Sequence, residues 1–149
     1  MPLTSYAMCA VRIVIKMQPF RKLVDTPSLT ISYDSANEWL YIEWKGLQNE
    51  TSVLAGFGLI LRCLQAWECK KILNDSSLVT STWASAGQWL GHDFFQCLAQ
   101  EGIRYVAWIS SPHWSDRRAI DAGLQFMTNP IIIMFDEIAT AYAWLQQSL

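Results

Sequence analysis

The regular part of the chain opens with two alternating segments of apolar and polar residues. Residues 29–33 alternate strictly, as a half-buried strand does, and residues 39–44 form a second strand-like segment. Residues 34–37, Asp-Ser-Ala-Asn, have the composition of a turn. The two segments together predict an antiparallel hairpin near the N-terminal end of the fold.

The second of these segments is apolar on both of its faces. Trp39 and Tyr41 share one face, whereas Leu40, Ile42 and Trp44 share the other, because side chains alternate along a strand. Such a strand is either covered on both sides by other parts of the chain or has one face at an interface.

After Gly46 the apolar period changes from two to 3.6 residues. Val53, Phe57, Ile60 and Leu64 fall on one helical stripe, and Thr51 or Ser52 is expected to cap this helix. Gly56 and Gly58 lower its intrinsic helicity, so we expect them to permit close packing on a sheet.

The remaining chain alternates short apolar strands with helical segments. Strands are expected at 72–75, 103–109 and 131–135, and helices at 83–101, at 115–127 and after Asp136. The predicted fold class is therefore α/β, in the order β-β-α-β-α-β-α-β-α. An N-terminal β-hairpin leads into a mainly parallel four- to five-stranded sheet with four helices and right-handed crossovers.

Composition narrows the function classes. The chain has 149 residues, 16% of them charged, with eight tryptophans and a net charge of −2. This aromatic content is not that of a disordered chain, and the charge is not that of a polycationic nucleic-acid binder. We expect one domain over residues 29–149. Residues 1–28 are expected to be an N-terminal extension, partly non-native, with a short edge strand at 11–15 as the competing interpretation.

The cysteines and histidines indicate neither a metal centre nor a disulfide framework. Cys9, Cys63, Cys69 and Cys97 include no C-x-x-C pair, and the chain has only two histidines. We therefore expect no metal and no cofactor, and a reducing, cytoplasmic location. No uncharged apolar run reaches the roughly 18 residues that a membrane span needs, so no span is expected.

Three segments resemble those of a known family. They are Asn-Glu-Trp-Leu-Tyr-Ile-Glu-Trp-Lys-Gly at 37–46, Lys-Ile-Leu-Asn-Asp-Ser at 71–76, and Met-Phe-Asp-Glu-Ile-Ala-Thr-Ala-Tyr-Ala-Trp-Leu at 134–145. Their order and spacing resemble the STAS domain, named for sulfate transporters and anti-sigma-factor antagonists. More closely, they resemble the small bacterial STAS-like, sporulation-antagonist-like proteins, whose fold is related to CRAL-TRIO domains. The resemblance covers about residues 29–145.

The resemblance implies binding rather than catalysis. STAS domains mostly bind protein partners, and some resemble nucleotide or lipid binders. Sigma-factor antagonists of this family carry a phosphorylated serine in an Asp-Ser pair at the start of a helix. Residues 83–87, Trp-Ala-Ser-Ala-Gly, occupy that place here and lack the pair. The resemblance therefore does not extend to the phosphorylation switch.

Candidate binding residues follow the predicted parallel strands, because ligands bind outside the carboxyl ends of such strands. The loops there combine hydroxyls with tryptophans, which suits a small amphipathic ligand or a peptide segment. The residues are Asp75, Ser76, Ser77, Thr80, Ser81, Trp83, Ser111, His113 and Trp114. The competing interpretation is that Asp75 and the hydroxyls only cap helices and turns.

Three functions remain open from the sequence. The leading hypothesis is a non-enzymatic regulatory or protein-binding module of STAS-like type that engages a protein partner through these loops. The alternative is a carrier or sensor of a small apolar ligand in a pocket lined by tryptophans: Trp83, Trp89, Trp108 and Trp114. The third is a small hydrolase that uses His113 and Asp75, although no G-x-S-x-G motif is present.

Overall fold

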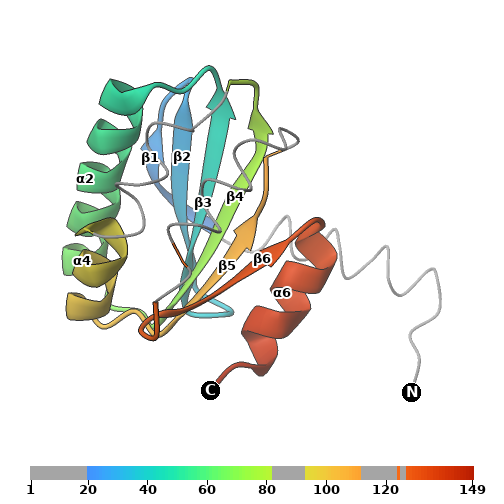
Figure 1. The fold of residues 1–149 in the computed structure, drawn as a ribbon. Helices are drawn as coiled ribbons and strands as arrows, with labels where there is room; N and C mark the ends of the chain where they lie inside the picture. Colours follow the sequence, from blue (N-terminus) through green and yellow to red (C-terminus); the bar gives the residue numbers. More distant parts are fainter. Residues whose placement is uncertain (1–19, 82–92, 112–123, 125–126) are drawn as a thin grey trace.

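The protein folds as a six-stranded mixed sheet with helices on both faces (Figure 1). The computed structural model describes residues 20–81, 93–111, 124 and 127–149. In chain order, the strands are β1 (Phe20–Asp25), β2 (Leu29–Asp34), β3 (Trp39–Gly46), β4 (Lys71–Val79), β5 (Tyr105–Ile109) and β6 (Ile131–Phe135). The helices of the described part are α2 (Glu50–Ala66), α4 (Phe95–Gln100) and α6 (Ile138–Gln147).

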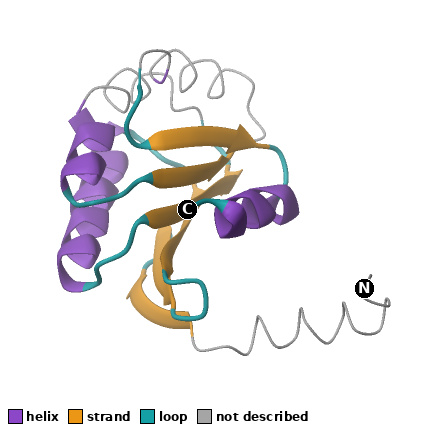
Figure 2. Cartoon of the chain, turned by 90° about the horizontal axis from the view of Figure 1, so that it is seen from below, coloured by secondary structure: helices purple, strands orange, loops and turns teal. Residues whose placement is uncertain are grey.

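Each strand pairs with the next one along the chain, so the spatial order is β1-β2-β3-β4-β5-β6. Strand β2 is antiparallel to both of its neighbours, β1 and β3, whereas β3 to β6 are parallel. Right-handed crossovers that always step in the same direction place their helices on one face. Accordingly α2 and α4 lie on one side of the sheet, and α6, which follows the last strand, lies on the other (Figures 1 and 2).

The α/β class and the hairpin of β2 and β3 are confirmed, but the expected strand and helix pattern is wrong in part. The sheet has six strands rather than four or five, because residues 20–25 pair with β2 as an edge strand. It is mixed rather than mainly parallel at this end. The helix expected at 83–101 is described only from Phe95 to Gln100, and the one expected at 115–127 lies almost entirely outside the described residues. The strand proposed at 11–15 lies outside them as well.

The larger core layer lies between the sheet and helices α2 and α4. In α2 the predicted stripe points inward: Val53, Phe57, Ile60 and Leu64 are all buried. Asn49, not Thr51 or Ser52, is the N-cap, because its side chain accepts a hydrogen bond from Ser52 N while Ser52 Oγ accepts one from Asn49 N, both at 2.9 Å. Aromatic contacts join the two helices across this layer, with Phe57 and Phe94 stacked at 3.8 Å between ring centroids.

The smaller core layer lies under α6, and it explains the apolar residues on both faces of β3. Its buried members come from β3, β4, β5 and α6: Trp39, Leu73, Ala107, Ile109, Ala141 and Leu145. Tyr142 packs edge-on against Trp39 with ring centroids 5.1 Å apart. At the end of α6, Lys71 Nζ donates a hydrogen bond to Leu145 O at 2.8 Å. The expectation that β3 is covered on both sides is thereby confirmed.

Candidate functional site

The carboxyl ends of the parallel strands meet at one edge of the sheet, as the candidate binding residues require. The arrowheads of β3 and β4 lie at the top of Figure 1, at the same end of the molecule as the beginning of α2. Strand β3 ends at Gly46 and β4 ends at Val79. Ligands of open parallel sheets bind at this edge, so the residues around these two strand ends form the candidate site.

Strand β4 is longer than its sequence predicts. The apolar pattern ends at Asp75, but the strand continues to Val79, and Ser76 and Ser77 are part of it rather than of a loop. Glu43 pairs with Asp75 and Lys45 pairs with Leu78, so β4 advances by three residues where β3 advances by two. The pairing resumes after this bulge, and Thr80 N donates a hydrogen bond to Gly46 O at 3.0 Å. The expected polar loop therefore begins later than Ser76.

Asp75 faces the α6 side of the sheet, where it belongs to a polar cluster with Tyr41 and Glu43. Tyr41 Oη donates a hydrogen bond to Asp75 Oδ2 at 3.3 Å, and its distance to Glu43 Oε2 is 3.2 Å. Ser77 N donates to Asp75 Oδ1 at 2.9 Å, so the buried carboxylate of Asp75 is held on both oxygens. The contact with Ser77 N is local, as in the competing interpretation, whereas the contact with Tyr41 crosses to the neighbouring strand.

The two carboxylates determine what Tyr41 can do. Burial, followed by the negative charges of Asp75 and Glu43, raises the pKa of Tyr41 far above its ordinary value of 10.0. The phenol therefore stays protonated and acts as a hydrogen-bond donor, not as a base. In this state it bridges Glu43 and Asp75, which pair in register on neighbouring strands.

Ser76 faces the opposite side of the sheet, towards α2, because neighbouring residues in a strand alternate. Nearby on this face, Trp44 Nε1 donates a hydrogen bond to Asn74 Oδ1 at 2.9 Å. Asn74 Nδ2 and Ser76 Oγ are buried without a hydrogen-bond partner among the described residues. Asp75 and Ser76 are adjacent in sequence, but the sheet keeps them apart, so they cannot contact one small ligand together.

Ser81 stabilises the fold rather than offering a free hydroxyl. Gln48 N donates to Ser81 Oγ at 2.6 Å, and Ser81 Oγ donates to Gln48 O at 2.8 Å. The buried side chain of Gln48 is held in turn, because its Nε2 donates to Ser28 O and Lys45 O and its Oε1 accepts from Ser52 Oγ. This network fastens the end of β4 to the connection between β3 and α2.

Four exposed residues at the ends of β3 and β4, together with the half-buried Lys45, form what we term the carboxyl-edge surface; the exposed ones are Leu47, Ser77, Leu78 and Thr80. Leu47 is 78% exposed and Leu78 is 52% exposed. Lys45 pairs with Leu78, and Thr80 N bonds to Gly46 O, which places these residues next to one another across the two strands. The surface presents two leucines beside the hydroxyls of Ser77 and Thr80, with Lys45 as its cationic group.

The other predicted site residues divide into one that is buried and three that lie outside the described residues. Ser111 follows β5 and is buried. Trp83, His113 and Trp114 are not among the described residues. The pairing of His113 with Asp75 that a hydrolase would need therefore stays a prediction.

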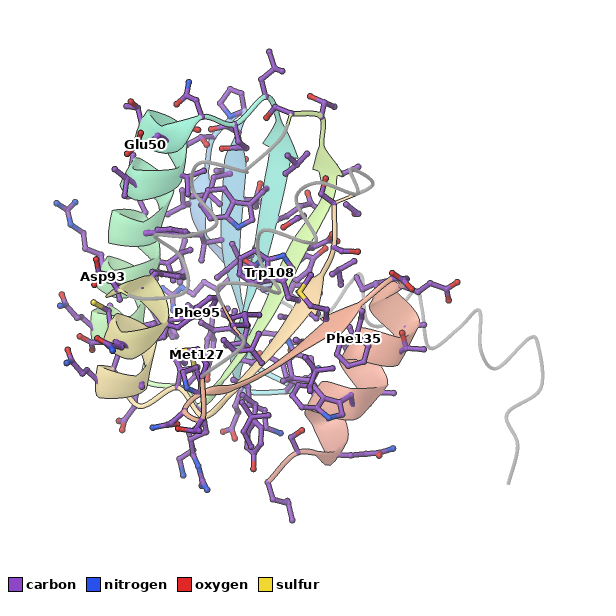
Figure 3. All side chains as sticks on the ribbon, viewed as in Figure 1. Glu50, Asp93, Phe95, Trp108, Met127 and Phe135 are labelled. Atoms are coloured by element: carbon purple, nitrogen blue, oxygen red, sulfur yellow. The ribbon has the colours of Figure 1, made fainter. Side chains whose placement is uncertain are left out.

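The tryptophan-lined pocket is described at only one of its four expected residues. Trp83, Trp89 and Trp114 lie outside the described residues, but Trp108 is placed. Its ring contacts Phe95 in the larger core layer, with centroids 5.8 Å apart (Figure 3). Trp108 is thus a core residue with 2% exposure.

Sequence reasoning missed the residues that define the carboxyl-edge surface and its support. In the sequence, Leu47 and Leu78 are ordinary apolar residues, and only the pairing of Lys45 with Leu78 places both leucines at the same end of the sheet. Gln48 gave no periodic signal because it lies in a connection. A usable signal for Tyr41 and Glu43 existed, since both share one face of β3 and Asp75 follows an apolar run on the next strand.

The described part of the chain holds no group of three or more His, Cys, Asp or Glu residues that could bind a metal ion. Within the same residues, none of the helices is both long and apolar enough to cross a membrane. No protein-family model matches the chain, and no curated protein of known function matches it.

Proposed function

We propose that this chain is a non-enzymatic protein-binding module of STAS-like type, and that its partner docks on the carboxyl-edge surface. The observation that carries the proposal is the exposure of Leu47, directly after β3, and of Leu78, on the neighbouring strand β4. Two exposed leucines at the same end of the sheet bury apolar area when a partner covers them. The hydroxyls of Ser77 and Thr80 supply polar contacts at the rim of such an interface.

The support beneath Leu47 also favours recognition. Leu47 lies between Gly46 and Gln48, and the backbone of both neighbours is hydrogen-bonded. The carbonyl of Gly46 accepts from Thr80 N, and both the N–H and the carbonyl of Gln48 bond to Ser81 Oγ. A surface that is already ordered loses little conformational entropy when a partner binds. Leu78 follows the bulge of β4 and is held by its pairing with Lys45.

The carboxylate chemistry at the same edge supports a binding role more than a catalytic one. Asp75 already accepts hydrogen bonds from Tyr41 Oη and Ser77 N, and a Tyr41 with a raised pKa does not serve as a base. The described cysteines, Cys63, Cys69 and Cys97, are free thiols, which agrees with a reducing, cytoplasmic setting.

Site-specific photocrosslinking in cells that express the full chain tests the proposal. A photoreactive amino acid at position 47 or 78 is expected to give a discrete adduct with a second polypeptide. The matched control is position 149, a leucine that is 93% exposed at the other end of α6. Leu78→Asp should abolish the adduct formed from position 47 while circular dichroism shows an unchanged fold. Equal labelling from positions 47, 78 and 149 would overturn the proposal.

A further inference from the structure

A groove runs between the edge strand β1 and the C-terminal half of α2, on the side of the sheet away from α6. Its volume is about 290 Å³. A bulge in β1 between Lys22 and Val24 turns Leu23 and Val24 towards the helix. The residues that line the groove are Leu23, Val24, Leu59, Arg62, Cys63, Ala66 and Trp67. Six of these seven side chains carry no charge, so the lining is mainly apolar.

The wall formed by Trp67 is fixed by its neighbours. Tyr33 packs against its ring, with centroids 4.9 Å apart, and the guanidinium carbon of Arg21 lies over the same ring at 5.0 Å from the centroid. These contacts hold Trp67 from the strand side, so the groove is already formed without an occupant.

The charged side chains that line the groove or cover its Trp67 wall are two arginines. Arg62 is part of the lining, and Arg21 lies over Trp67 at its border. Among the described residues the one ion pair joins Lys22 to Asp25, so neither arginine has a carboxylate partner there. No acidic residue lines the groove. Two arginines beside an apolar surface are complementary to a molecule with an apolar body and an anionic end.

We propose that this groove binds an amphipathic anion, a single acyl chain with a carboxylate or phosphate head group. The chain lies against Leu23, Leu59 and Ala66, and the head group is held by Arg62 and Arg21. The volume of about 290 Å³ lies just below the usual range for small-molecule sites, about 300 to 1,000 Å³, which fits one chain better than a two-chain lipid. This site is separate from the carboxyl-edge surface and does not depend on the function proposed for it.

Isothermal titration with ten-carbon probes below their micelle concentrations tests the site. Decanoate and decyl phosphate are expected to bind saturably, and comparison of the two identifies the preferred head group. Decyltrimethylammonium has the same chain with a positive head group and should not bind. Equal affinity for the cationic and anionic probes, or no saturable binding of either anion, would overturn the proposal.

Three variants locate the binding. Arg62→Gln should weaken decanoate about tenfold, the loss expected for a charge-assisted hydrogen bond. Ala66→Leu adds volume inside the groove and should weaken both anionic probes at least as much. Arg104→Gln is the matched control, since Arg104 is exposed beside Tyr105 and does not line the groove. The affinity of this variant for decanoate should equal that of the wild type.

A chemical readout separates loss of binding from loss of fold. Cys63 lines the groove, whereas Cys97 lies on α4. Decanoate should slow alkylation of Cys63 by iodoacetamide, read by peptide mass spectrometry, and leave the rate at Cys97 unchanged. Thermal midpoints are measured for each variant, because Arg62 also lies near the negative end of the α2 dipole. Equal protection of both cysteines, or none at Cys63, would contradict the proposed site.

Discussion

The indole ring of Trp44 occupies the space that a side chain at Gly56 would fill. A Cβ built at Gly56 would overlap Cη2 and Cζ3 of Trp44 and would lie 3.3 Å from Leu29 Cδ2. Helix α2 can therefore approach β3 closely only because residue 56 has no side chain. The same glycine weakens the helix by about 1 kcal/mol relative to alanine, so packing outweighs helix propensity here.

Gly56→Ala should destabilise the protein by about 1 to 3 kcal/mol, because overpacking exceeds the gain in helix propensity. Gly58→Ala is the matched control on the same helix, since a Cβ there meets nothing within 4 Å. It should stabilise by up to about 1 kcal/mol. Urea denaturation measures both. A Gly56→Ala variant as stable as Gly58→Ala would show that α2 does not pack against Trp44 in this way.

Two serines of the candidate site should respond differently to the same substitution by alanine. Ser81→Ala should cost about 1 to 3 kcal/mol, because it leaves Gln48 N without its acceptor. Ser76→Ala should be neutral or stabilising by about 1 kcal/mol, because Ser76 Oγ is buried without a described partner. Equal losses of unfolding free energy for the two variants would contradict the distinction.

Tyr41 should make the protein less stable in alkaline solution. The pKa of Tyr41 is raised in the folded state, so above pH 10 the unfolded chain releases this proton while the folded chain keeps it. The stability that this tyrosine contributes is thus present below pH 10 and lost above it, by about 1.4 kcal/mol at pH 11. Denaturation curves of Tyr41→Phe should show a correspondingly smaller loss between pH 8 and pH 11. Parallel pH profiles for the two proteins would oppose this assignment.

Leu145 should be essential for the attachment of α6. It is completely buried in the smaller core layer, and Leu145→Ala should cost about 2 to 5 kcal/mol. Leu149→Ala, four residues later and 93% exposed, should change stability by less than about 0.5 kcal/mol. Thermal unfolding measures both. Similar small effects would mean that α6 does not pack on the sheet as described.

The two edges of the sheet differ in how they are protected from association. Strand β1 carries Arg21, Lys22 and Asp25, whereas β6 carries no charge, and its Ile131 and Ile133 are 47% and 40% exposed. Ile133→Lys should keep stability within about 0.5 kcal/mol and raise the concentration at which light scattering detects aggregates.

Ile132 provides the control for the β6 edge, since it packs against the larger core layer. Ile132→Lys should destabilise the fold because it places a charge against apolar side chains. An Ile133→Lys variant that loses as much stability as Ile132→Lys would show that Ile133 is covered in the folded protein.

Most of the fold was readable from periodicity where a segment packs strongly on a defined face. Trp39 and Leu40, on opposite faces of β3, predict the two core layers. Phe57 and Ile60 predict the buried stripe of α2. Strand β1 could not be read in this way, because half of its residues are charged and only β2 pairs with it. An edge strand of this kind has too little burial to leave a pattern.

The candidate site was less predictable than the fold because it depends on register between strands. The bulge in β4 decides that Leu78 lies beside Lys45, and nothing in the local sequence specifies that extra residue. Alternation, by contrast, was sufficient to foresee that Asp75 and Ser76 face opposite ways once both belong to one strand. The mistake over these two residues came from ending β4 too early.

The sequential strand order has a consequence for how the chain folds. Because every strand pairs with the one before it, each new strand finds its neighbour already made, and no strand has to be inserted between two that have formed. Each pairing within the sheet therefore closes a single hairpin or a single crossover connection, which keeps the entropy cost of loop closure below that of pairing across several elements. The sheet can grow in the direction of synthesis from β1 to β6, and α6, which follows β6, then covers the face that was still open to water.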